Sequence, residues 1–207
     1  MPGGGEPGTR AVLVWRFPEP VAVLTSAPVG GPGPVGWVVD IEVDGDYART
    51  DLEVHVRQVA ARLELAGPGV GLLTAAPVSA LDAACDGGVV VHATVGITRP
   101  TWAAGRDGSS AVRAGASWQP GTINTVVQLP VTLSPGAAVN AVVTATEAKA
   151  QALLEAGIPG TGTASDAIAV CWPLRGAPEP FAGPRSTWGA RLARAVHAAT
   201  AAGAARA

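Results

Sequence analysis

Residues 119–170 decide the fold, and they read QPGTINTVVQLPVTLSPGAAVNAVVTATEAKAQALLEAGIPGTGTASDAIAV. A β-branched run at 122–128 is followed by a helical pattern, a loop rich in Gly and Thr, and a second apolar run at 167–171. A strand, a helix and a second strand in this order form a crossover unit of an α/β protein. The few polar side chains of this stretch are the first candidates for a functional site.

The helical pattern of this unit has a clear start and a clear end. Ser134 can cap free N–H groups, Pro135 is tolerated at the first helical position, and Gly157 ends the pattern. At about 100° per residue, one stripe is predicted to face the sheet: Val139, Val142, Val143, Thr146, Ala150, Leu153 and Leu154.

The rest of the chain has the pattern of a scaffold. Strands are predicted at 11–15, 20–26, 37–45, 69–76, 89–96, 122–128 and 167–171, and helices at 51–67, 134–157 and 186–202. Asp40, Glu42 and Asp44 alternate along one face of a predicted strand, which we interpret as a solvated edge. The sequence therefore predicts an α/β fold: a single domain with a mixed β-sheet and crossover helices packed on it.

Composition limits the classes of protein. Residues 10–207 are enough for one domain, and the Gly/Pro-rich residues 1–9 are predicted to be a disordered leader. The net charge is −2 and Lys149 is the single lysine, so the basic patch of a nucleic-acid-binding protein is absent. Two cysteines and three scattered histidines suggest no metal site. No membrane span or signal peptide is visible, so a cytoplasmic protein is expected.

Two polar residues at the start of the 122–128 run share one face. Side chains alternate along a strand, so Thr122 and Asn124 project to the same side. A hydroxyl and an amide in this arrangement can bind an amide substrate, or both can satisfy neighbouring backbone groups. The Gly/Thr-rich loop after the predicted helix supplies further hydroxyls at Thr161, Thr163 and Ser165, directly before Asp166. Asp166 can orient a base, bind a substrate amide, or cap the turn.

Glu147 and Lys149 lie at opposite borders of the predicted helical stripe, so they cannot pair with each other. Each can lean over the stripe, which is a setting for an acid or base with a shifted pKa. The alternative is an amphipathic border whose long side chains reach water. The position of the only lysine favours the functional interpretation.

A second group of candidates lies earlier in the chain. The Gly-rich loop at 27–36 is either a turn or a ligand loop, because glycines with positive φ can leave backbone N–H groups free. Thr25 and Ser26 place hydroxyls beside it, and Thr94 shares a strand face with His92. The predicted substrate-binding residues are Thr25, Ser26, Gly30, Gly31, Thr94, Gly121 and Thr163.

Several blocks occur together in a characteristic order. They are LTSAPVGG, GLLTAAPV, HATVGITRP, GTINTVV, LSPGAAVNAVVTATEAKAQALLEAG, GTASDAIAV and FAGPRSTWG. Through these blocks, which span about residues 15–196, the chain resembles the adenosylcobinamide amidohydrolase family of corrinoid salvage. The family pattern often has an asparagine in the Gly-rich loop where this chain has Val29 to Pro32, so the backbone amides would be the groups left to contact a substrate there.

The resemblance implies a reaction and a substrate. It implies hydrolysis of the amide between the aminopropanol arm and the corrin ring of adenosylcobinamide, with no cofactor, since the corrinoid is the substrate. The products would be adenosylcobyric acid and 1-aminopropan-2-ol. A non-catalytic corrinoid-binding protein and an amidase for another substrate remain alternatives.

The chemistry of amide hydrolysis suggests roles for the candidates. We predict Thr122 or a water as nucleophile, Glu147 or Lys149 in proton transfer, Asn124 as an oxyanion donor and Asp166 as the orienting group. On this hypothesis E147Q should cost orders of magnitude in turnover. A fainter likeness to self-cleaving amidases with an N-terminal nucleophile suggests that cleavage after Gly121 would free Thr122.

Overall fold

The structure is a computed structural model that describes residues 8–106 and 121–206. In order, its elements are β1 (Thr9–Thr25), β2 (Gly33–Val43), α1 (Leu52–Arg62), β3 (Gly69–Thr74), the short 3₁₀ helix η1 (Val78–Ala80), β4 (Asp82–Asp86), β5 (Val89–Val95), β6 (Ile123–Gln128), α2 (Pro135–Glu155), β7 (Ala167–Pro173) and α3 (Thr187–Ala204). Over the described ranges, seven strands form one sheet in the order β3-β2-β1-β7-β6-β5-β4. The sheet is mixed, because β2/β3 and β6/β7 are parallel pairs and the other neighbours are antiparallel. The predicted α/β class is confirmed.

The first strand joins two halves of this sheet. β1 pairs with β2 over most of its length, and its last part also pairs with β7. Two separate strands broken at Phe17 and Pro18 were predicted, and this is wrong. The β1/β2 pairing shifts register between Arg16 and Val21, so Pro18 and Pro20 lie outside the regular ladder, where the missing N–H groups are tolerated.

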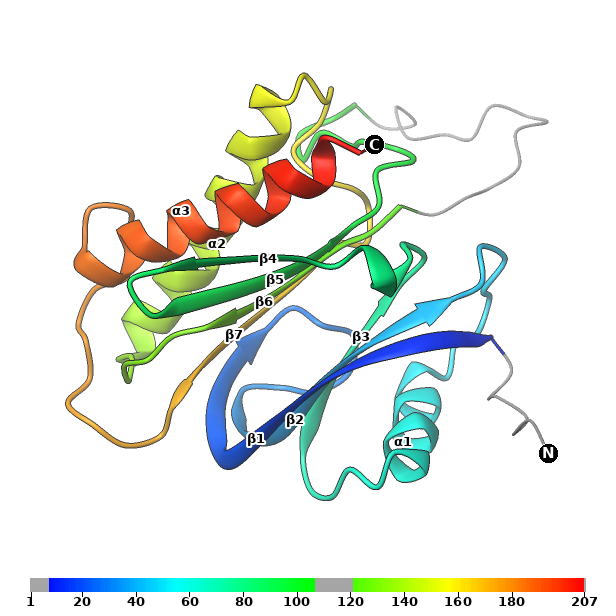
Figure 1. Cartoon of the computed structure of the whole chain (residues 1–207), viewed down its shortest axis with the longest axis horizontal. Coiled ribbons are helices and arrows are strands. Elements are labelled where there is room, and N and C mark those ends of the chain that lie inside the picture. Colours follow the sequence, from blue (N-terminus) through cyan, green and yellow to red (C-terminus); the bar gives the residue numbers. More distant parts are fainter. Residues whose placement is uncertain (1–7, 107–120, 207) are drawn as a thin grey trace.

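The two halves of the sheet pack face to face. Inner side chains of β2 and β3, such as Val38 and Leu72, share a core with Val126 of β6 and Ala169 of β7. Helices α2 and α3 cover the other face of β4–β7, and α1 packs against the outer face of β1–β3 (Figure 1). The β2 and β3 strands are thereby brought over the start of β6.

Helix α2 begins as predicted but turns a different face inward. The Ser134 hydroxyl accepts a hydrogen bond from the Ala137 N–H at 3.2 Å. Three residues of the predicted inner stripe, Val139, Val143 and Leu154, are exposed, so that prediction is wrong. The buried face is instead formed mainly by alanines: Ala137, Ala138, Ala141, Thr144, Ala145, Ala148, Lys149, Ala152 and Leu153. Small side chains on this face allow α2 to lie close to α3 and to the sheet.

Strand β4 was missed by the sequence prediction, which placed a loop or a helical turn there. It forms a hairpin with β5 through Gly87 and Gly88, whose φ angles are +53° and +93°. Asp-Gly-Gly is a strong hairpin signal, because two positive φ angles in the turn match the twist of the strands.

Candidate active site

The polar residues predicted in the central unit gather where β6 and β7 begin. The two strands are parallel, and Asn124 lies opposite Ala167. Residues just before each strand are therefore neighbours at the same edge of the sheet. A cavity of about 390 Å³ lies here, and its lining includes Ser26, Tyr47, Leu73, Asn124, Ser165 and Asp166.

Lys149 and Asp166 form an ion pair at this edge, with only 7% and 10% of their side chains exposed. Asp166 also accepts hydrogen bonds from the Ile123 N–H at 2.9 Å, the Thr163 hydroxyl at 2.5 Å and the Thr163 N–H at 3.1 Å. Asp166 therefore caps the turn before β7 and is at the same time the ion-pair partner of Lys149. The buried charges are paired, as stability demands.

Gly162 is the residue that leaves room for the ion pair. A Cβ atom at this position would lie 2.2 Å from the Asp166 Oδ2 and 2.6 Å from the Lys149 Nζ. Any larger side chain would push the two charged groups apart. The Gly/Thr-rich loop before β7 therefore packs directly against Lys149 of α2.

Thr122 and Ser165 form a pair of hydroxyl groups 2.7 Å apart. The Ser165 hydroxyl donates its hydrogen to the Gly121 carbonyl at 3.2 Å, so the hydrogen between the two hydroxyls comes from Thr122. Thr122 is buried, whereas Ser165 is exposed and lines the cavity. Ser165 was noted in the sequence only as one hydroxyl of the turn, and its contact with Thr122 depends on the β6/β7 pairing.

Asp40 of β2 is a site residue that the sequence interpretation missed. It is 1% exposed, and it accepts hydrogen bonds from the Thr94 hydroxyl and the Asn124 side-chain amide, each at 2.8 Å. The expectation of a solvated edge is therefore wrong at Asp40, because the folded sheet covers this face of β2. Burial raises the pKa of Asp40 to about 6, although the hydrogen bonds from Thr94 and Asn124 act in the opposite direction.

The side-chain amide of Asn124 has a fixed orientation. Its Nδ2 donates to Asp40 at 2.8 Å and to the Leu73 carbonyl at 3.0 Å. Turning the amide over would place its oxygen against the Leu73 carbonyl, which needs a donor. Both N–H groups are therefore used, and this geometry does not support Asn124 as an oxyanion donor. Its Oδ1 is buried and has no hydrogen-bond partner among the described residues.

The other predicted binding residues are divided between this cavity and other surroundings. Ser26 lines the cavity and bonds to Ile168 through both backbone and side chain. The Thr25 hydroxyl instead accepts a hydrogen bond from the Ala27 N–H within a turn. The Thr94 hydroxyl donates to Asp40 and is not among the groups that line the cavity. Gly121 is buried beside the Thr122–Ser165 pair.

The Gly-rich loop does not reach this cavity. Gly30 and Gly31 line a separate cavity of about 360 Å³ together with Trp37 and Gly69. Gly30 has a φ of +105° and packs against the backbone of β3, so its role in the structure is that of a tight turn.

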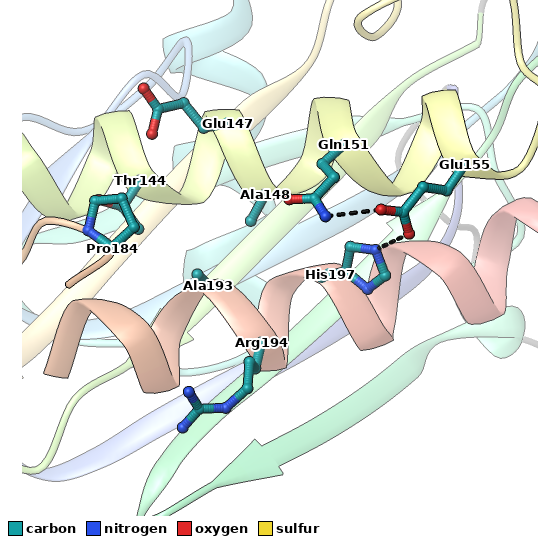
Figure 2. A pocket seen from close by; sticks show the side chains of 9 residues that line it. All are labelled: Thr144, Glu147, Ala148, Gln151, Glu155, Pro184, Ala193, Arg194 and His197. Carbon is teal, nitrogen blue, oxygen red and sulfur yellow. Dashed lines mark hydrogen bonds and ion pairs between the residues drawn. The ribbon is translucent and has the colours of Figure 1, made fainter. Parts of the chain in front are cut away.

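Glu147 lies on the exposed side of α2. It lines a groove between α2 and α3, in which Glu155 pairs with His197, and Figure 2 shows its carboxylate directed away from α3. Glu147 also borders a further cavity of about 360 Å³ that includes Lys149 and Thr163. Of the two candidates for proton transfer, the structure brings only Lys149 into contact with Asp166.

Two wider observations concern the described part of the chain, residues 8–106 and 121–206. No group of three or more His, Cys, Asp or Glu side chains is placed to hold a metal ion. None of the helices in this part of the chain is long and apolar enough to cross a membrane.

An α/β scaffold that holds a buried lysine, a carboxylate and paired hydroxyls at a cavity has the groups that hydrolysis of an amide uses. These features are consistent with an amidohydrolase. The family model described as adenosylcobinamide amidohydrolase matches residues 4–207, so the chain belongs to this family. The adenosylcobinamide amidohydrolase of Methanosarcina mazei is 29% identical over 176 residues, which cover 81% of this chain and 82% of that protein. The family resemblance seen in the sequence is confirmed, and the chain is an amidohydrolase.

Proposed function

We propose that this chain hydrolyses the amide that joins the aminopropanol arm to the corrin ring of adenosylcobinamide. The products are adenosylcobyric acid and 1-aminopropan-2-ol. The observation that carries the proposal is the family match over nearly the whole chain, and the name of the Methanosarcina mazei relative supports it.

The size of the cavity supports binding of the arm rather than of the ring. A volume of about 390 Å³ is at the small end of the range for ligand sites. The amide and its aminopropanol group fit this volume, while the macrocycle is too large and rests outside. Pro28, Tyr47 and Leu52 at the lining offer apolar surface to the ring edge.

Hydrolysis places the hydroxyl of water on the carbonyl carbon and a proton on the leaving nitrogen as the C–N bond breaks. Either a water held by the Thr122–Ser165 pair attacks the carbonyl carbon directly, or Thr122 attacks first and forms an acyl ester that a water then hydrolyses. Lys149, oriented by Asp166, supplies the proton to the leaving amine and is protonated again by the proton that the attacking hydroxyl or water gives up. Ser26, Gly121 and Thr163 remain proposed substrate contacts, and protein groups with water complete the reaction without a cofactor.

The test is incubation with adenosylcobinamide and detection of adenosylcobyric acid and 1-aminopropan-2-ol by mass spectrometry. Wild type should form both products in equal amounts. T122V should lose at least about 100-fold in kcat if the hydroxyl takes part in the chemistry. T125V is the matched control, because Thr125 is a buried threonine of β6, three residues further along the chain.

Three other outcomes contradict the proposal. Corrinoid binding without products would indicate a binding protein, and cleavage of other amides alone would indicate a different amidase. Equal activity of T122V and T125V would remove the Thr122 hydroxyl from the mechanism.

A further inference from the structure

Asn124 has a side-chain hydrogen-bond acceptor that none of the described residues uses. The residue is 2% exposed and lines the cavity at the start of β6 and β7. Its Oδ1 has no partner among the residues that the structure describes. A buried acceptor without a donor is costly, so such an atom beside a cavity points to a ligand that supplies the missing hydrogen.

Two acceptors on other strands fix this oxygen in place. Asp40 on β2 and the Leu73 carbonyl on β3 each take one hydrogen of the Asn124 amide, at 2.8 and 3.0 Å. Asp40 is itself held by the Thr94 hydroxyl. With both N–H groups engaged, only Oδ1 is left to interact with a ligand.

We propose that Asp40 is a positioning residue, which holds Asn124 so that its Oδ1 accepts a hydrogen bond from the N–H of the substrate amide. This inference rests on the proposed function, because it names the part of the substrate that Asn124 recognises. It replaces the oxyanion-donor role expected from the sequence. Asp40 does not touch the substrate and acts only through Asn124.

The chemistry of a secondary amide fits this arrangement. The substrate has one N–H hydrogen, and an acceptor that takes it fixes the rotation of the reacting group. The nitrogen lone pair that develops as the carbonyl is attacked is then left free for a proton from Lys149. The carboxylate product has no N–H group, so it loses this contact and is released.

The experiment compares D40A with D40N. D40A removes the acceptor and frees the Asn124 amide, and kcat/KM should fall by about 10-fold to 100-fold, mainly through kcat. In D40N the new amide oxygen can accept from Asn124, while its N–H group donates to the Thr94 oxygen. D40N should therefore restore kcat/KM to within about threefold of wild type, the size of effect expected when a hydrogen-bond network is kept.

Two further variants keep the test independent of folding. D44A is the matched control, because Asp44 follows β2 directly and forms an exposed ion pair with Arg10, so wild-type kinetics are expected. N124A removes the acceptor itself and should show the same loss in kcat as D40A. Circular dichroism and thermal unfolding establish that each variant is folded.

The outcomes separate this inference from the proposed function. Wild-type kcat in folded D40A or in N124A overturns the inference, and so does D40N that is as inactive as D40A, since Asp40 would then act by its charge or proton. If wild type releases no adenosylcobyric acid, the proposed function fails. Whether Asp40 holds the Asn124 side-chain amide is then tested by NMR. The hydrogens of the Asn124 side-chain NH₂ group should exchange with solvent slowly in wild type and D40N and rapidly in D40A. Equal exchange in all three overturns the inference.

Discussion

Lys149 of α2 and Asp166, directly before β7, form an ion pair that is buried between the helix and the Gly/Thr-rich loop. The pair connects α2 to the loop before β7, and Gly162 of that loop leaves room for the two charged groups. It therefore contributes to the stability of the site as well as to its chemistry.

Loss of one partner should be costly. K149M leaves the Asp166 carboxylate without its buried cation and should lower the free energy of unfolding by about 3 kcal/mol. Urea denaturation at neutral pH measures this change. R57M is the control, because Arg57 pairs with Glu53 on the exposed face of α1 and should change stability by less than about 1 kcal/mol. Equal effects of the two substitutions would show that the Lys149 pair adds nothing.

Asp40 should make the folded protein less stable as pH rises. Its pKa is about 6 in the folded state and near 3.8 when unfolded, so the folded state binds more protons between these values. Stability should fall across this window by about 3 kcal/mol and then level off. D40N lacks this dependence, so its stability relative to wild type should rise from pH 4 to pH 7.

The difference in the free energy of unfolding between D40N and wild type reports on the titration of Asp40 alone. Burial lowers the pKa of His92, which gives a contribution of opposite sign, lost as pH falls, but both proteins share it. A constant difference between D40N and wild type from pH 4 to pH 7 would mean that Asp40 does not titrate in this range.

Glu147 provides a test of the alternative proton carrier. Its carboxylate lies on the exposed side of α2, and Lys149 already contacts Asp166. We expect E147Q to keep kcat within about threefold of wild type, as for surface substitutions in general. A loss of orders of magnitude in steady-state turnover would restore Glu147 to the mechanism.

The bond between Gly121 and Thr122 is tested by the intact mass of the purified protein. Among the described residues the Thr122 hydroxyl bonds to Ser165, which is not a base, so we expect one unbroken chain of 20.5 kDa. Two fragments that meet between Gly121 and Thr122 would support self-processing. In that case S165A, which removes the donor to the Gly121 carbonyl, should slow the cleavage.

The sequence was informative where local chemistry decides the structure. Ser134 and Pro135 mark the start of α2, and the polar residues at the start of the 122–128 run lie where β6 and β7 begin, with Thr122 bonded to Ser165 and Asn124 to Asp40. The scarcity of lysine directed attention to Lys149, but its ion pair with Asp166 was not predicted, because it depends on how α2 packs on the loop before β7.

Long-range packing was beyond the reach of the sequence pattern. The alternation of side chains along β2 predicts on which face of the strand Asp40 lies. Whether that face is covered depends on how the sheet folds over at β1, which the sequence pattern does not show. Helical periodicity likewise allows either a valine face or an alanine face of α2 to turn inward. The alanine face is buried because α3 and the sheet both pack closely against α2. The sequence of α2 alone does not show how closely these elements approach it.

The long strand β1 belongs to both walls of the cavity. Neither wall is an autonomous module, so one cannot be exchanged for that of a relative without refitting the other. Adaptation to ligands of different shape is therefore expected to come from substitutions around the cavity entrance, with the hydrogen-bonded frame beneath them unchanged.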